Sequence, residues 1–259
     1  MKKTICETNT SETNHQETSD IILAGSGIMG AMQMTRETEA KLKTCDIVYV
    51  LHYDNSLYKF VESLGVKTVD ASEFYKDGQD RTEVYRRIAD SIIQDAKIQQ
   101  VGFLVHGHPL FIVSTSEYLI QEAKNSGLKL EILPAVSSLD TVITDLQLDL
   151  GYALQLYEAN FMLNMNPKID NKVPLLIFQV AVLGLFSVQK SYQDVDLHPL
   201  QEFLLKYYPA THVITFVLSS KHVLVSSDKL EVKVEELDKI NVDFLEGRPT
   251  LYIPPIEGE

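Results

Sequence analysis

The stretch "IILAGSGIMG", residues 21–30, decides how the rest of the chain is interpreted, because it joins an apolar run to a glycine-rich turn. The apolar part is typical of a buried strand, and the glycines allow a sharp turn after it. Downstream, helix-like segments alternate with β-rich runs. The expected helices are 35–46, 81–97 and 114–127, and the expected strands are 47–51, 101–105 and 128–134. This alternation predicts a mostly parallel α/β layer.

A second α/β region is expected to follow the segment 137–151, which we interpret as a helix ending at Gly151. Its expected strands are 154–159, 174–182, 211–219 and 250–255. We find no internal repeat and no flexible linker. The sequence therefore predicts two α/β domains in close contact, 20–136 and 137–259, preceded by a disordered tail over 1–19.

Composition limits the classes of function. The 259 residues carry a formal net charge of −13, which disfavours nucleic acid as a partner because nucleic-acid binders normally present a basic face. Cys6 and Cys45 are too few for a disulfide framework, so a reducing, cytoplasmic location is expected. The start lacks the apolar segment of a signal peptide. The longest apolar stretch, 173–188, is too short for a membrane span and is interrupted by proline, glutamine and glycine.

Gly25, Gly27 and Gly30 have the spacing of the dinucleotide-binding fingerprint, and Asp54 follows the next strand where a ribose-binding acid would lie. That motif requires a helix to begin at the glycines, so that its N-terminus faces the pyrophosphate. Here the best helix start is Thr35. We therefore favour a tight turn over a dinucleotide site.

Two further loops each connect an expected strand to a helix: "HGHP", residues 106–109, and "PAVSS", residues 134–138. Such loops lie at the carboxyl ends of parallel strands, where open α/β sheets bind ligands. His106 and His108 lack a cysteine or carboxylate at ligand spacing, so no metal is expected. Taken alone, Ser137 and Ser138 are best explained as helix caps.

The stretch "FYKDGQDRTEVY", residues 74–85, places Tyr75, Arg81 and Tyr85 around a turn at Gly78. Asp80 marks the start of a helix, which puts Arg81 in its first turn and the second tyrosine one turn later. From spacing alone, a tyrosine packed beside the apolar stripe of this helix is favoured over a functional one.

Four segments together resemble the tetrapyrrole methylase family of S-adenosylmethionine-dependent methyltransferases. They are "GSGIMGAMQMTRETEAKLKTCDIVYVL", "FLVHGHPLFIV", "LPAVSSLDTVITDL" and "TLYIPP", and the similarity runs from about residue 21 to 255. The resemblance implies two α/β domains of the tetrapyrrole methylase type, with S-adenosylmethionine in the cleft between them and S-adenosylhomocysteine as its product. It also implies a homodimer.

Within that family the chain is most similar to the borosin peptide α-N-methyltransferases, which have a "GSGI" opening, a "YGHP" loop and a tyrosine, arginine, tyrosine set with this spacing. The resemblance implies that Tyr75, Arg81 and Tyr85 catalyse methylation of a backbone amide. His106 replaces the family's tyrosine, so any contact of that phenol would have to be made differently. Because the chain ends soon after "TLYIPP", we expect a split enzyme acting on a separate precursor peptide, as a homodimer or as a heterotetramer with that precursor.

By the same resemblance, the methyl donor is expected to contact the glycine turn, the two later loops and one residue of the second domain. These residues are Gly25, Gly27, His106, His108, Phe111, Ile112, Ser137, Ser138 and Gln179. Gln179 is a polar residue in an expected apolar strand, so it needs a partner or a ligand.

An amide nitrogen is a poor nucleophile because its lone pair is delocalised into the carbonyl group. The three-residue set suits this problem: Arg81 can stabilise charge on the amide oxygen, and a tyrosine can take the proton. Two alternatives stay open. One is a methyltransferase for a porphyrinoid, ribosomal RNA or a modified histidine; the other is a non-catalytic protein that binds the donor.

Overall fold

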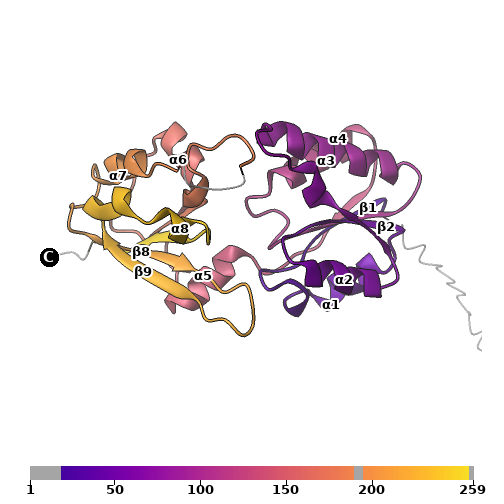
Figure 1. Cartoon of the computed structure of the whole chain (residues 1–259), viewed down its shortest axis with the longest axis horizontal. Coiled ribbons are helices and arrows are strands. Elements are labelled where there is room, and N and C mark those ends of the chain that lie inside the picture. Colours follow the sequence, from indigo (N-terminus) through magenta and orange to yellow (C-terminus); the bar gives the residue numbers. More distant parts are fainter. Residues whose placement is uncertain (1–18, 190–194, 257–259) are drawn as a thin grey trace, which may run out of the picture.

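The computed structural model describes residues 19–189 and 195–256, and it folds into two α/β domains (Figure 1). Each domain contains one five-stranded sheet. The predicted disordered tail, apart from Ser19, lies outside the described residues. Two α/β domains are what the sequence predicts.

The first sheet consists of β1 (Ile21–Gly25), β2 (Ile47–Leu51), β3 (Lys67–Asp70), β4 (Val101–Val105) and β5 (Leu130–Ile132). The strands are all parallel, in the order β3-β2-β4-β1-β5. Val105 pairs with Gly25 on one side and with Leu51 on the other. The three central strands therefore end together, and the loops that follow them meet at one edge of the sheet.

Helices cover both faces of this sheet (Figure 1). One face carries η1 (Gly30–Met32), α1 (Arg36–Leu42) and α2 (Asn55–Ser63), and the other carries η2 (Ala71–Phe74), α3 (Arg81–Ala96) and α4 (Ser114–Asn125). The apolar stripe Val84, Ile88 and Ile92 of α3 is fully buried, which explains why this segment packs as a helix. Asp80 caps α3 by accepting a hydrogen bond from the backbone N–H of Glu83, as predicted.

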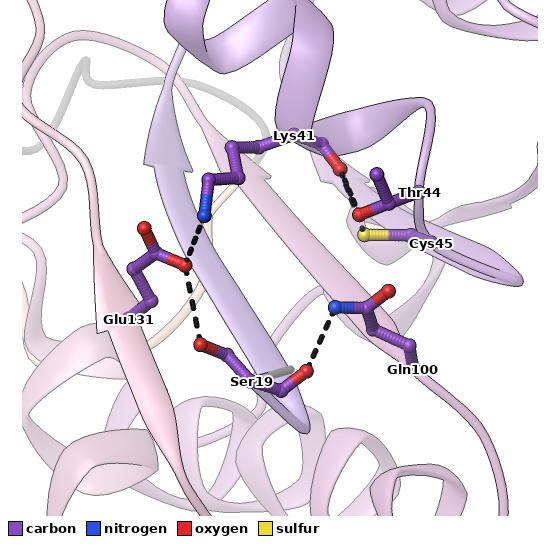
Figure 2. A network of polar contacts seen from close by, with 6 residues as sticks. All are labelled: Ser19, Lys41, Thr44, Cys45, Gln100 and Glu131. Atoms are coloured by element: carbon purple, nitrogen blue, oxygen red, sulfur yellow. Dashed lines mark hydrogen bonds and ion pairs between the residues drawn. The ribbon is translucent and has the colours of Figure 1, made fainter. Parts of the chain in front are cut away.

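The opposite, amino edge of the sheet is held by a polar network (Figure 2). Ser19 donates its hydroxyl to Glu131 (3.1 Å), and its carbonyl oxygen accepts from the Gln100 side chain (2.8 Å). Lys41 of α1 forms an ion pair with Glu131 (2.8 Å). These contacts join the start of the domain to α1, β4 and β5.

The second sheet is mixed, in the order β6-β7-β10-β8-β9; β6 and β7 are parallel and the remaining neighbours antiparallel. Its strands are β6 (Gln155–Glu158), β7 (Leu175–Phe178), β8 (Val213–Leu218), β9 (Asp228–Lys233) and β10 (Thr250–Ile253). Its helices are α5 (Ser138–Leu146), α6 (Ala159–Met165), η3 (Val180–Val182), α7 (His198–Leu204), η4 (Val234–Lys239) and α8 (Val242–Leu245).

Three predicted elements end several residues earlier than the sequence suggests. The helix expected over 35–46 stops at Leu42. The helix expected over 137–151 stops at Leu146, because Gln147 adopts a left-handed conformation with φ 57°. The strand expected over 174–182 stops at Phe178, because Gln179 is also left-handed (φ 59°) and a 3-10 turn follows. The prediction that Gln179 lies inside an apolar strand is therefore wrong; it is exposed at the carboxyl end of β7.

The two domains are joined by backbone pairing as well as by apolar packing. Gly78 donates to Val188 (2.8 Å), and Val188 donates back to Gln79 (2.7 Å). Phe111 and Ile112 of the first domain pack into a cluster that includes residues of α5, β7 and β8. The loops at the carboxyl edge of the first sheet therefore face the second domain.

Candidate active site

Three loops of the first domain are pressed together at the carboxyl edge of its sheet. A Cβ atom on Gly25 would lie 2.0 Å from the carbonyl oxygen of Gly107 and 2.7 Å from Cβ of Ala135. Gly27 and Gly107 also pair through their backbones, with N···O distances of 3.0 and 3.4 Å. Gly25 is thus required by close packing, and a side chain there would push these loops apart.

Hydrogen bonds within the segment 28–33 satisfy the backbone of the glycine turn. Oε1 of Gln33 accepts hydrogen bonds from the backbone N–H groups of Ile28 (2.8 Å) and Met29 (3.0 Å), the groups a pyrophosphate would need. Asp54 caps α2 and accepts two hydrogen bonds from Ser56. The tight-turn interpretation is confirmed, and helix α1 begins only after its cap at Thr35.

Tyr75, Arg81 and Tyr85, which we call the tyrosine–arginine group, lie close together as the sequence suggests. The two phenol rings are 6.3 Å apart between centroids and meet edge to face. The side-chain Nε–H group of Arg81 donates to the carbonyl oxygen of Ser187 (3.0 Å). The backbone N–H group of Arg81 donates to the carbonyl oxygen of Phe186 (3.1 Å). Arg81 is thereby fixed against the second domain.

Burial raises the pKa of Tyr75 to about 12, and neighbouring Tyr85 acts in the same direction. A hydrogen bond from the Thr115 side chain and the charges of Arg81 and Arg248 oppose this rise in pKa. At neutral pH, Tyr75 is consequently a protonated phenol that can donate a hydrogen bond.

A second group, which we call the histidine group, consists of His52, Tyr53 and His106 and follows β2 and β4. His52 stacks on Tyr53 with ring centroids 4.5 Å apart, and the His106 ring meets both at 4.9 and 5.1 Å. Nδ1 of His106 lies 3.0 Å from Nε2 of His52. Burial lowers the pKa of His106 to about 3, helped by His52 and by the charges of Lys221 and Arg248. This imidazole is therefore neutral at physiological pH.

The second domain brings cations to the histidine group. Nζ of Lys221 lies 5.6 Å from the centroid of the Tyr53 ring and donates a hydrogen bond to the carbonyl oxygen of Gly247 (2.9 Å). Partial desolvation and neighbouring Arg248 lower the pKa of Lys221. In a chain with a net charge of −13, this local positive charge favours a ligand atom that is negative or accepts hydrogen bonds.

The other residues predicted to contact the donor lie in the loop after β4 and at the start of α5. Phe111 packs edge to face on Phe178 of β7, with centroids 5.0 Å apart. Nδ1 of His108 accepts from the backbone N–H of Leu110 (3.1 Å). Ser137 caps α5 in a capping box with Asp140, so the predicted capping role is confirmed, and Ser138 is the first residue of that helix.

Backbone strain occurs on both sides of the domain boundary. Ile112, Gln179 and Arg248 all have φ near +60°, a region that non-glycine residues rarely adopt and that β-branched residues avoid. Strain of this kind costs about 1–3 kcal/mol per residue and is concentrated at ligand-binding sites. Its occurrence here supports a functional role for this boundary.

Several residues of the site were not predicted from the sequence. They are His52, Tyr53, Thr115, Ser187, Lys221 and Arg248. The first two directly follow a buried strand, so the rule that ligands bind at the carboxyl ends of parallel strands could have identified them. Thr115 of α4 reaches Tyr75 within the first domain, whereas Ser187, Lys221 and Arg248 depend on how the two domains meet, for which the sequence carries no local signal.

Two hollows are present, and neither is lined by the tyrosine–arginine group or the histidine group. One of about 160 Å³ lies between the glycine turn, α5 and the loop after β8; the other, of about 390 Å³, lies between α6 and the segment Leu183–Phe186. Within 19–189 and 195–256, no three histidine, cysteine or acidic side chains form a group that could hold a metal ion. No helix in these ranges is long and apolar enough to cross a membrane.

A family model described as tetrapyrrole (corrin/porphyrin) methylases matches residues 20–174, more than half of the chain. The chain belongs to the tetrapyrrole methylase family. Solved structures agree with this membership in fold. The uroporphyrin-III C-methyltransferase of Thermus thermophilus has a TM-score of 0.60 at 17% identity, covering 91% of this chain and 94% of that one. A cobalt precorrin-4 methyltransferase also has a TM-score of 0.60, at 13% identity, covering 91% and 95%.

Curated relatives within the family are named as methyltransferases joined to borosin peptide precursors. A type III borosin precursor from Anomoporia bombycina is 27% identical over 91% of this chain, and a type I precursor from Coprinopsis marcescibilis is 24% identical over 94%. A type II precursor from Phlebiopsis gigantea is 26% identical over 95%. The matched part is 28%, 64% and 45% of the length of these three relatives, so this family member corresponds to only part of each.

Proposed function

We propose that the chain is an S-adenosylmethionine-dependent methyltransferase that methylates backbone amide nitrogens of a peptide. The observation that carries the proposal is the tyrosine–arginine group, in which two phenols and a guanidinium converge where the first domain faces the second. The names of the curated relatives support a peptide substrate. The methylase family supports the methyl donor.

The loops at the carboxyl edge fit such a donor. Gly25 and Gly27 leave their backbone without side chains where three loops converge, and Phe111 with Phe178 offers an apolar wall. We assign donor contacts to these residues and to His106, His108, Ile112, Ser137, Ser138 and Gln179. When bound, S-adenosylmethionine supplies an electrophilic methyl group, whose bond to sulfur breaks as the bond to nitrogen forms, leaving S-adenosylhomocysteine.

Arg81 is suited to stabilise charge on the substrate's carbonyl oxygen. Its Nε is held by Ser187, whereas its two terminal nitrogens have no hydrogen-bond partner among the described residues. A guanidinium keeps its charge at all relevant pH values, and its terminal N–H groups can bind one oxygen from a fixed direction. An amide nitrogen becomes nucleophilic only as negative charge moves onto that oxygen.

The two tyrosines take different parts in this proposal. Tyr75 stays protonated because its pKa is raised to about 12, so it donates a hydrogen bond to the same carbonyl oxygen. Tyr85, half-buried in the next turn of α3, acts in its phenolate form and accepts the amide proton directly or through a water molecule, which returns it to the neutral phenol. The electron pair of the N–H bond stays on nitrogen and forms the new bond to carbon. The substrate thus provides the nucleophile, which explains why no serine or cysteine is needed here.

Intact-mass analysis tests the proposal. Candidate precursor peptides are incubated in trans with the protein and the donor, and added methyl groups located on backbone nitrogens are the expected result. Methylation in trans would also support the predicted separate precursor, and size-exclusion chromatography with light scattering would test the proposed homodimer. Binding of S-adenosylhomocysteine without methylation of any peptide would favour a different substrate or a non-catalytic role.

A further inference from the structure

The hydrogen bonds of the histidine group fix where its protons lie. Nδ1 of His52 accepts from the backbone N–H of Asp54 (2.9 Å). A backbone amide can only donate, so this nitrogen carries no proton and the neutral ring is protonated at Nε2. Burial lowers the pKa of His52, in agreement with a neutral ring.

The tautomer of His52 determines the tautomer of His106. Because Nε2 of His52 carries the proton, it donates across the 3.0 Å contact to Nδ1 of His106. A proton on that nitrogen of His106 would face the proton of its neighbour, so His106 must be neutral and protonated at Nε2. Within the part of the chain that the structure describes, this Nε2–H group has no hydrogen-bond partner.

The surroundings of His106 favour an oxygen ligand. Tyr53 stacks beside the pair, and Lys221 and Arg248 bring positive charge from the second domain. No acidic side chain contributes to the shift in pKa of His106. A neutral N–H group among cations attracts a hydrogen-bond acceptor with negative charge.

We infer that His106 is a fixed hydrogen-bond donor, presenting Nε2–H to an oxygen of the bound ligands, and that His52 is the positioning residue that sets its tautomer. The identity of that oxygen rests on the proposed function: either the carboxylate of the methyl donor or the amide oxygen of the peptide.

Nuclear magnetic resonance can read the tautomer in the ligand-free protein. Long-range ¹H–¹⁵N correlation spectra distinguish a protonated Nδ1 from a protonated Nε2, and the loss of signals in His106→Gln assigns the peaks. We expect His106 to be the neutral Nε2–H tautomer from pH 6 to 8. We expect His52→Phe to give a mixture of tautomers, and His52→Gln, whose amide can still donate to Nδ1, to restore the single form. A protonated Nδ1, or a His106 tautomer unaffected by His52→Phe, overturns the inference.

Enzyme measurements identify the oxygen. His106→Phe removes the hydrogen-bond donor at this position, whereas His106→Gln keeps an N–H group. Only His106→Phe should therefore lose about tenfold in either ligand affinity or kcat, the effect of one hydrogen bond. Weaker binding of S-adenosylhomocysteine (a higher Kd) with unchanged kcat identifies the carboxylate of the methyl donor as the hydrogen-bond acceptor. A lower kcat at unchanged Kd identifies the amide oxygen. His198→Gln, at an exposed position of α7, is the matched control, and thermal unfolding verifies that each variant folds.

Wild-type values of both Kd and kcat in folded His106→Phe would overturn the inference. If the wild-type protein neither binds S-adenosylhomocysteine nor methylates peptides, the proposed function fails for a reason separate from the tautomer, which the spectra still decide. In that case the assignment of the acceptor to these two ligands is overturned as well.

Discussion

The tyrosine–arginine group and the histidine group flank the same edge of the first sheet but differ in charge. The first carries the permanent cation of Arg81, anchored to the second domain through the backbone at Ser187. The second has no charged member, and its two imidazole rings are oriented by the backbone amide of Asp54. The comparison indicates a division of work in which one group stabilises developing charge and the other orients a ligand. Substitutions in the two groups should therefore differ in size of effect.

The largest loss is expected for Arg81→Lys. An ammonium lacks the planar spacing between the Nε–H group that binds Ser187 and the terminal N–H groups assigned to the substrate oxygen. The kcat should therefore fall about 10²–10³-fold, the size seen when one oxyanion donor is removed. Single-turnover kinetics measures the effect. Arg87→Lys is the control, because Arg87 lies on the same helix and donates its hydrogen bonds to Phe74 and Gln79. Equal losses in the two variants would contradict the assigned role.

Gly25→Ala should damage the histidine group more than the tyrosine–arginine group. The new Cβ would overlap the carbonyl oxygen of Gly107, next to His106, and should cost about 2–4 kcal/mol of stability. Urea denaturation measures the loss, and His106 resonances report the local shift. Gly151→Ala, whose Cβ would face only the Asp149 side chain at 3.1 Å, should cost far less.

Tyr→Phe substitution should lower kcat by different amounts at the two tyrosines. Loss of the proton acceptor in Tyr85→Phe should lower kcat about 100-fold, whereas loss of one hydrogen-bond donor in Tyr75→Phe should lower it about tenfold. Stopped reactions analysed by mass spectrometry give both rates. The control is Tyr118→Phe, where the ring stacks under Arg86. The reverse order of the losses would exchange the two roles.

The smallest effect concerns alkaline stability. Since the pKa of Tyr75 is raised from 10.0 to about 12 in the folded protein, the unfolded chain loses this proton first as pH rises. The contribution of Tyr75 is fully present below pH 10 and is lost between about pH 10 and 12, with a size below about 2 kcal/mol. Urea midpoints at pH 9 and 11 should fall less for Tyr75→Phe than for the wild type. An identical decline would show that Tyr75 is not the group responsible.

Local patterns predicted those parts of the molecule that local physics determines. Helix α3 followed from Asp80 and the spacing of Val84, Ile88 and Ile92, and the loops at His106 and Ser137 followed from strand-to-helix transitions. The sequence analysis missed strands β3 and β9 and helices α2, α6, α7 and α8. The strand segments "KTVD" and "DKLEVK" are too polar to signal a strand. Their pairing comes from neighbouring strands, a tertiary effect that short windows do not contain.

The candidate site was predictable only in part for a similar reason. Tyr75, Arg81 and Tyr85 lie within one stretch of chain, so spacing and resemblance could bring them together. Lys221 and Arg248 lie far away in sequence and reach the histidine group only because the second domain packs there. Gln179 was misplaced because a left-handed residue can end a strand without any glycine to announce it.

The polar network at Ser19 has a practical consequence for binding measurements. Ser19 leaves the first domain at the amino edge of a sheet whose central strands are five residues long, so about 16 Å of β-structure separates it from the carboxyl edge. A biotin tether attached ahead of Ser19 would hold the protein on a sensor chip with the candidate site turned toward the flowing solution. Immobilisation through surface lysines would instead risk modifying Lys221.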